Sequence, residues 1–487
     1  MKRFPYLYLL AVFLFCSTPL LEAAPPAQGI ATSKLSPDKD TPAAEAKRLA
    51  KKAHEKGSVR ILVELKEGLT AKDYAKIKQK KGKRQRLLEF QQNALMEDVP
   101  VRNTKATKRY EYLPYMALSV TEAELKNLRN SGRVAGIFED HIDFPQSHEV
   151  STAQIGAKVG WNLGFTGRGQ TIAVIDSGVD KFHPYLQNKV VREVCFSSRI
   201  EDKPTGIKTV TPLCRGGRTS IVGKGAAQAN CRVGDIGCAH GTFVAALAAG
   251  NSREPGFTHS GVAPEANIIA IKAESSFNVS QDCAPESAPC KGFFTSDELK
   301  ALDYVLKINN RQRGRGRLHI AAVNMSLGGP AAGRCFKGPV RRTIQLLKKA
   351  KIATIVSSGN DGTPYDISFP ACIPEAISVG ATDPVTHAVS DFSNGGRSLD
   401  LLAPGQGIGV PYFAIDPSGA EVVLSGTSFS APLVAGAWAA LKSHKPNASV
   451  NEILQILQST GVGVVDLRNA TIKPEIRIGQ AHSVIKP

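Results

Sequence analysis

Several features are missing from this chain of 487 residues, and each absence excludes a class of protein. Beyond the N-terminal segment, no run is long and apolar enough to cross a membrane, and no unit of sequence repeats. Two basic stretches, at 76–86 and 311–317, contain no interleaved aromatic residue and no recognisable nucleic-acid-reading motif. The net charge of +18 favours acidic surfaces in general. We therefore predict no nucleic-acid partner and no stable membrane anchor.

The first 23 residues have the composition of a signal peptide. Lys2 and Arg3 precede an apolar run at 4–14, and the small residues Ala23 and Ala24 offer a cleavage site. A membrane anchor is the alternative, but Cys16, Ser17, Thr18 and Pro19 interrupt the run, which is therefore short for a membrane span. The sequence therefore predicts a secreted protein, either extracellular or periplasmic.

The cysteines lack the short CxxC or CxxH pairs that a zinc site would use. Cys16 lies in the signal peptide, which leaves eight cysteines in the exported chain, where an oxidising compartment favours disulfides. Eight cysteines allow roughly a hundred pairings. Because neighbouring cysteines flank short loops, we expect the pairs Cys195–Cys214, Cys231–Cys238 and Cys283–Cys290, with Cys335 and Cys372 remaining.

Two further segments precede the main part of the chain. Residues 24–57 are rich in Ala, Pro and Lys and predict a flexible lead. Residues 58–146 mix strand-like and helical patterns, and Thr121 with Glu124 has the spacing of a helix capping box. The expected elements are strands at 60–65, 116–120 and 133–138 and a basic helix at about 83–97. This pattern predicts a small α+β domain.

The remaining residues, 147–487, alternate apolar strand-like runs with helical segments. The runs are QTIAVIDSG, ANIIAIKA, LHIAAVNMSLGG, KIATIVSSGN and EAISVGAT, with helices expected at 296–309 and 340–350. Strands that are apolar on both faces, joined by helices, predict an α/β fold: a parallel β-sheet with helices on both faces. Sites in such sheets gather at the carboxyl ends of the strands. Asp176, Asn324 and Asn360 end three of these runs and are expected to share a cleft.

Three local motifs carry the chemistry of the chain. They are AVIDSGVD with Asp176, CAHGTFVAALAAG with His240, and LSGTSFSAPLVAG with Ser428. A nucleophilic serine needs a base within hydrogen-bond reach, and the base needs a carboxylate that fixes its tautomer. Gly426 allows a sharp turn before Ser428, and a helix that starts there aims backbone N–H groups at a developing oxyanion. Each motif is common alone, whereas the three together predict a catalytic triad.

From about Gly156 to its end, the sequence resembles the subtilisin family of serine proteases, with the three motifs in the order Asp, His, Ser. The resemblance implies a serine endopeptidase that hydrolyses peptide bonds through an acyl-enzyme intermediate. It makes Asp176 the residue that orients the imidazole, His240 the general base and then acid, and Ser428 the nucleophile. The segment SSGNDG matches the family's oxyanion segment, which implies Asn360 as a donor to the oxyanion.

The resemblance also implies the substrate-binding residues. The segment NMSLGG matches the strand that pairs with the substrate backbone, and Asn324 within it is then structural. The implied substrate-binding residues are Ser326, Leu327, Gly328, Ser358 and Gly359. Asp361 follows at the rim of the family's pocket, where an acid would favour Lys or Arg before the scissile bond; a solvated loop aspartate is the alternative.

By the same resemblance, residues 58–146 are an inhibitory propeptide that acts as an intramolecular inhibitor of its own enzyme. The segment VAGIFEDHIDFPQ resembles the part of that propeptide that ends in the active-site cleft. The chain is then an autoprocessed zymogen, acts on polypeptide substrates, and makes its first cut near Gln146 and Ser147.

The sequence departs from the family at a few positions. Phe243 and Leu433 stand where the family often has histidine, and Tyr185 stands where an aspartate commonly binds calcium. We therefore expect the best-known calcium site to be absent, leave other structural calcium open, and expect no cofactor to be required for catalysis.

Two other functions fit the sequence less well than a protease. A non-enzymatic binding protein on this scaffold would be expected to lose a triad residue or Asn360, and all four are present. An esterase of the α/β-hydrolase class would need G-x-S-x-G and the order Ser, Asp, His, and neither occurs around Ser428.

Overall fold

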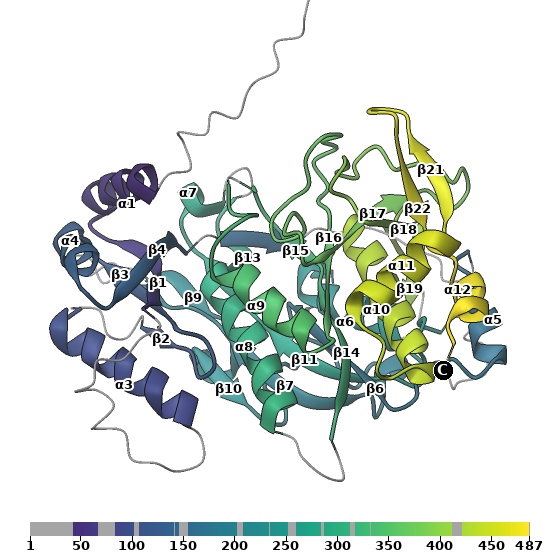
Figure 1. The fold of residues 1–487 in the computed structure, drawn as a ribbon, viewed down its shortest axis with the longest axis horizontal. Coiled ribbons are helices and arrows are strands. Elements are labelled where there is room, and N and C mark those ends of the chain that lie inside the picture. Colours follow the sequence, from purple (N-terminus) through teal and green to yellow (C-terminus); the bar gives the residue numbers. More distant parts are fainter. Residues whose placement is uncertain are drawn as a thin grey trace, which may run out of the picture.

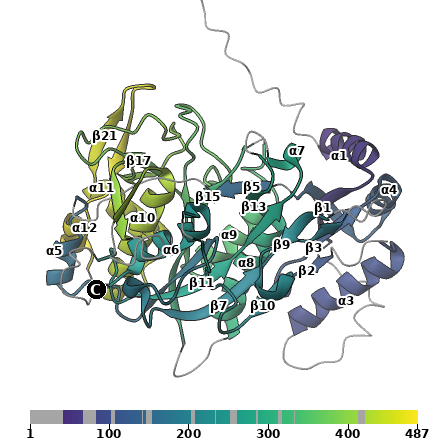
Figure 2. The same ribbon diagram turned by 180° about the vertical axis from the view of Figure 1, so that it is seen from behind.

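The structure is a computed structural model, and its chain forms a small N-terminal unit beside a larger one (Figures 1 and 2). It describes residues 42–66, 83–101, 107–140, 142–145, 154–201, 208–232, 234–251, 260–283, 287–311, 317–331, 333–411 and 421–486. The predicted signal peptide, the first part of the lead and the expected cleavage site at Gln146 and Ser147 lie outside the described residues.

The larger unit is built on a ten-stranded sheet. Its strands are β6 (Gln170–Asp176), β7 (Val190–Phe196), β10 (Ser220–Val222), β11 (Asn267–Lys272), β14 (His319–Met325), β16 (Ala353–Ser357), β17 (Ile377–Thr382), β18 (Leu401–Pro404), β21 (Val462–Asp466) and β22 (Thr471–Glu475). They lie in the order β10-β7-β11-β6-β14-β16-β17-β18-β22-β21. Every pair from β7 to β22 is parallel, and only the two edge strands, β10 and β21, run antiparallel to their neighbours.

Helices cover both faces of this sheet. One face packs against α6 (Ile236–Ala249), α10 (Thr427–His444) and α11 (Val450–Thr460), and the other against α8 (Thr295–Arg311) and α9 (Pro339–Lys349). Successive residues of β6 show the two layers: Ile172 and Val174 belong to the first core, and Ala173 and Ile175 to the second. The predicted α/β fold, a parallel sheet with helices on both faces, is therefore confirmed.

Shorter elements complete the larger unit. They are α5 (Ala157–Asn162), η3 (Pro184–Leu186), β8 (Ile200–Glu201), β9 (Lys208–Pro212), η4 (Arg215–Gly217), β12 (Glu274–Phe277), α7 (Ser280–Cys283), β13 (Cys290–Phe294), β15 (Leu327–Gly328), β19 (Ile408–Pro411), β20 (Glu421–Leu424) and α12 (Ile478–Val484). Of these, β13 and β15 flank the candidate site.

The small unit has an antiparallel sheet and its own core. Its elements are α1 (Pro42–Lys56), β1 (Val59–Leu65), α3 (Lys83–Asp98), β2 (Lys108–Arg109), β3 (Tyr115–Val120), α4 (Glu122–Asn130) and β4 (Val134–Glu139), with strands in the order β2-β3-β1-β4. The capping box predicted before α4 is present, because the Thr121 hydroxyl accepts from Glu124 N and the Glu124 carboxylate accepts from Thr121 N. Figure 1 shows this unit set to one side of the large sheet.

The prediction of a flexible lead over residues 24–57 is wrong for its second part, where α1 forms. Its Ala- and Lys-rich composition indicated a linker, yet Ala, Lys and Glu are also strong helix formers. Leu49 and Ala53 of this helix are buried in the core of the small unit, so tertiary packing holds α1 in place.

Four disulfides cross-link the larger unit. They are the three predicted pairs, Cys195–Cys214, Cys231–Cys238 and Cys283–Cys290, together with Cys335–Cys372. The nearest-neighbour pairing is therefore confirmed.

Candidate active site

A buried aspartate–histidine pair lies where β6 ends. Asp176 is the last residue of β6, and its Oδ1 accepts hydrogen bonds from His240 Nδ1 at 2.7 Å and from the backbone N–H of Ser177 at 2.7 Å. Because a carboxylate only accepts, His240 Nδ1 carries the proton in this contact. Both side chains are 1% exposed, so the pair is shielded from water.

Close contact between β6 and α6 brings His240 to Asp176. The Ser177 hydroxyl donates to Cys238 O and accepts from Gly241 N, each at 3.0 Å. A Cβ on Gly241 would lie 2.9 Å from the Cβ of Asp176 and closer still to Gly178 O. Only glycine fits after His240, which explains the HG dipeptide of the motif.

Ser428 is the second residue of α10, directly after the turn at Gly426 and Thr427. Its Oγ lies 3.3 Å from Ser326 O, and its own carbonyl accepts from Ser326 Oγ at 2.6 Å. The ring of Phe429, the next residue, lies 5.7 Å from the His240 ring between centroids. The structure thus brings the three predicted triad residues to one region, at the carboxyl ends of the strands.

Asn360 lies beside the start of α10. Its Oδ1 accepts from the backbone N–H of Thr427 at 2.9 Å and from the Thr427 hydroxyl at 2.8 Å. These bonds occupy the oxygen end of the carboxamide and leave its NH₂ end as the donor. Thr427 was not predicted as a site residue, although it lies between Gly426 and Ser428 in the GTS turn.

The predicted substrate-binding residues lie on two neighbouring segments. Ser326 follows β14, and Asn324 Nδ2 donates to its Oγ at 3.0 Å, which is a structural contact of the kind expected for Asn324. Ser358 and Gly359 follow β16, where Ser358 N donates to Val379 O and Gly359 N to Thr427 Oγ1. Leu327 and Gly328 form β15.

A strand from outside the larger unit occupies the space beside β15. This strand, β5 (Ile142–Pro145), lies between β15 and β13 in a six-stranded sheet of order β15-β5-β13-β12-β9-β8. Leu327 pairs with Pro145, Gly328 with Phe144, Phe293 with Asp143 and Phe294 with Ile142, all antiparallel. The sequence had indicated the β15 wall but not β13, whose run CKGFF is too short and mixed to stand out.

The three positions that depart from the resembled family are all buried. Phe243 and Leu433 are buried in the same core, so two apolar side chains pack where polar ones were expected. Tyr185 is also buried, and its carbonyl accepts from Asn251 N. Within the described ranges, no group of three or more His, Cys, Asp or Glu side chains could hold a metal ion.

The chain is similar in sequence to known proteins over most of its length. A model of the Subtilase family matches residues 167–474. The chain is 28% identical to Subtilisin E of Bacillus subtilis (strain 168) over 361 residues, which is 73% of this chain and 77% of that protein. It is 30% identical over 295 residues to an Intracellular serine protease of Paenibacillus polymyxa, covering 59% and 71% of the two chains. M-protease of Shouchella clausii is 26% identical over 360 residues, 73% of this chain and 76% of that one.

Proposed function

Because the chain belongs to the subtilase family and is a serine endopeptidase, we propose that Asp176, His240 and Ser428 form its catalytic triad. The observation that carries this proposal is the buried hydrogen bond of 2.7 Å between His240 Nδ1 and Asp176 Oδ1. The first turn of α10, which contains Ser428, lies at the same end of the sheet.

In the proposed reaction, Ser428 Oγ attacks the carbonyl carbon of the scissile peptide bond, and its proton moves to His240 Nε2. Asp176 remains ionised and stabilises the imidazolium through the Nδ1–H bond. The proton then passes to the leaving nitrogen as the C–N bond breaks, which leaves an ester on Ser428. Water attacks this ester by the same route, releases the carboxylic acid and restores the serine.

Asn360 would stabilise the charge that develops on the carbonyl oxygen. Its Nδ2 and the backbone N–H of Ser428, at the N-terminus of α10, are the proposed donors. Thr427 supports this role, because turning the Asn360 carboxamide over would break two hydrogen bonds. In subtilisin, a member of this family, loss of the corresponding donor costs about 10²–10³ in kcat.

The small unit would serve as the inhibitory propeptide, with residues 58–146 as its extent and 147–487 as the peptidase. The support is β5, which adds a strand between β13 and β15 in the way a bound peptide does. The last pair between β5 and β15 joins Pro145 to Leu327, the residue after Ser326, whose carbonyl accepts from Ser428 Oγ. We propose the first cut just beyond this strand, between Gln146 and Ser147.

Polar contacts between the small unit and α8 support the same proposal. Asp140 is buried, accepts from the backbone N–H of Ser296 at the start of α8, and pairs with Arg60. Asp303, further along α8, accepts from the backbone N–H groups of Glu111 and Tyr112. The small unit thereby binds α8 through charged groups as well as through its tail.

Export of this enzyme to an oxidising compartment is also part of the proposal. The four disulfides support it, because such bonds persist outside the reducing cytosol. Among the helices in the part of the chain that the structure describes, none has the length and apolar composition needed to span a bilayer. We further propose that catalysis needs no cofactor and that calcium does not bind at Tyr185; calcium titration monitored by thermal stability tests the latter.

Cleavage of a denatured protein tests the proposed function. The mature enzyme should digest it, and a serine-directed covalent inhibitor should abolish the digestion and label Ser428. Ser430→Ala is the matched control: Ser430 lies one residue beyond Phe429 in α10 and is bonded to Ala403 O, so its loss should leave cleavage intact. Cleavage by Ser428→Ala at the parent rate would overturn the assignment.

A further inference from the structure

A buried side chain from a distant segment holds the loop that carries Asn360. Asn394 Oδ1 accepts from the backbone N–H of Asp361 at 2.9 Å and of Thr363 at 3.1 Å, and Asn394 Nδ2 donates to Asp361 Oδ2 at 2.9 Å. The backbone N–H of Asn394 donates to Gly359 O at 2.9 Å. Residues on both sides of Asn360 are thus bonded to a single residue, which is 2% exposed.

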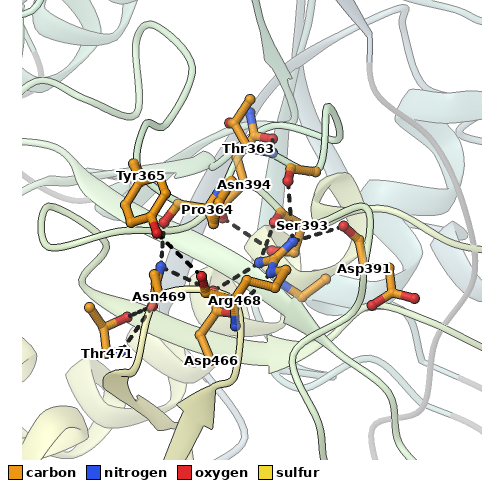
Figure 3. Close-up of polar contacts among 12 residues, drawn as sticks. Thr363, Pro364, Tyr365, Asp391, Ser393, Asn394, Asp466, Arg468, Asn469 and Thr471 are labelled. Atoms are coloured by element: carbon orange, nitrogen blue, oxygen red, sulfur yellow. Dashed lines mark hydrogen bonds and ion pairs between the residues drawn. The ribbon is translucent and has the colours of Figure 1, made fainter. Parts of the chain in front are cut away.

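Arg468 in turn holds the backbone around Asn394. Its Nη2 donates to Ser393 O at 2.8 Å and its Nη1 to Asp391 O at 2.8 Å, while Nη1 also lies 3.5 Å from Gly362 O. Figure 3 shows the guanidinium reaching from the turn between β21 and β22 toward these segments. One side chain therefore connects the segment of Asn394 with the loop that follows Asn360.

The guanidinium is itself fixed in direction. Asp466 accepts from Arg468 Nε and Nη2 at 2.9 Å each, a bidentate pair. Burial alone would raise the pKa of Asp466, but the bonds from Arg468 outweigh it and the pKa is lowered, so the carboxylate stays charged. Asn469 adds a bond from its Nδ2 to Pro364 O, also drawn in Figure 3.

From these contacts we propose that Arg468 is a positioning residue for the oxyanion donor Asn360, acting through Ser393 and Asn394. The inference rests on the proposed role of Asn360. Arg468 need not touch the substrate, since it fixes the backbone on which Asn360 lies. A misplacement of about 1 Å in a catalytic group can cost about 100-fold in rate. A shift of a few tenths of an ångström after loss of Arg468 should therefore lower kcat about tenfold.

The test compares Arg468→Met with a matched pair elsewhere in the same unit. Arg341 makes a bidentate pair with Glu375, at 2.8 and 2.9 Å, with a side chain 28% exposed against 23% for Arg468. Mature enzymes are prepared from the full chain. Where a variant is slow to cut its own junction, a tagged parent enzyme is added to make the cut and is then removed. Arg468→Met should lower kcat on a peptide amide about tenfold and change KM less than about twofold. Arg341→Met should lower thermal stability about as much as Arg468→Met does, and its kcat should be unchanged.

A double-mutant cycle identifies the residue through which Arg468 acts. In an Asn360→Gly background, Arg468→Met should lower kcat no further, because the donor it positions is gone. The same tenfold loss in both backgrounds, or an unchanged kcat in Arg468→Met, would overturn the proposal. Arg468→Lys, which keeps the charge but not the bidentate geometry, should fold. Its kcat should lie between those of the parent and Arg468→Met. If Asn360→Gly alone keeps full kcat, the oxyanion assignment itself fails, which is a different result.

Discussion

The small N-terminal unit has no cysteine and one four-stranded sheet, whereas the larger unit has a ten-stranded sheet and all four disulfides. Each has an apolar core, and their boundary combines shared apolar packing, which includes Leu62 and Tyr115, with charged groups such as Arg60, Asp140 and Asp303. A cleft of about 1050 Å³ opens along that boundary, lined by residues of both units. Disulfides cross-link the larger unit, whereas none of the four joins the small unit to it.

The strongest test of this contrast is to stop the first cut. In subtilisin, loss of the nucleophilic serine lowers kcat by about 2 × 10⁶, so Ser428→Ala should leave the junction near Gln146 uncut. The variant should be exported, lack only its signal peptide and accumulate with both units joined, while the parent appears as a shorter chain. A gel of material secreted from a protease-deficient host measures this. Normal maturation of Ser428→Ala would mean that another protease removes the small unit.

The disulfides should account for much of the durability of the larger unit. Cys335 and Cys372 are 37 residues apart in the chain, and Cys231 and Cys238 are 7 apart. If constraint of the unfolded chain dominates, replacing the first pair by serine should cost about 4 kcal/mol and the second about 2 kcal/mol. Thermal unfolding in a Ser428→Ala background, which prevents self-digestion, measures both. Equal losses would argue against the loop-length explanation.

Attachment of the small unit should depend on Asp140. Its carboxylate is fully buried, bonded to Arg60 Nε at 2.8 Å and to Ser296 N at 2.6 Å. Asp140→Asn leaves a buried cation without its anion, which costs about 3 kcal/mol, or about 100-fold in affinity. The measurement is dissociation on dilution of a two-chain complex in which Ser428→Ala prevents degradation. Asp98→Asn, which breaks an exposed pair with Arg133, is the control and should change affinity less than about twofold.

Local patterns in the sequence predicted the central strands and the triad, because the buried runs and the three motifs each lie within about ten residues. Elements that have no motif of their own and act through distant partners were not predicted. β13 has no distinctive pattern, and its importance comes from pairing with β5. Arg468 lies in a polar turn that resembles any other, and its proposed role depends on a segment 75 residues earlier. Helix α1 was missed because its residue types suit both linkers and helices.

The attachment should also respond to pH through Asp303. Burial raises the pKa of Asp303 to about 6, although Lys300 and the N–H of Tyr112 oppose the shift. In the separated larger unit, water should return this pKa toward 3.8, its ordinary value. The complex then holds more protons than its parts between these values, so affinity should rise by up to about 50-fold as the pH falls from about 7 to 4.

The same two-chain complex, titrated below pH 7, provides the measurement. Burial lowers the pKa of Lys300 to about 8, and staying below pH 7 keeps that group protonated. Asp303→Asn should bind with a flatter pH profile than the parent. An identical slope in the two complexes would show that other groups set the pH response.

The smallest expected effect concerns which bonds the larger unit cuts after the small one has left. In the proposed first cut the residue before the scissile bond is the uncharged Gln146, whereas Asp361 contributes an acid beside the proposed oxyanion donor. Asp361 is exposed and its carboxylate accepts from Asn394 Nδ2 at 2.9 Å, so its attraction for a substrate cation is screened by water and salt. We expect a preference for Lys or Arg before the scissile bond of about twofold to threefold, close to the strength of an exposed ion pair.

Asp361→Asn should remove that preference, and salt at about 0.5 M should weaken it in the parent. Asp366→Asn makes the same charge change at an exposed position of the same loop and should leave the preference intact. Cleavage-site profiling of a peptide mixture measures all three enzymes, and identical profiles would mean that Asp361 is only a solvated loop residue.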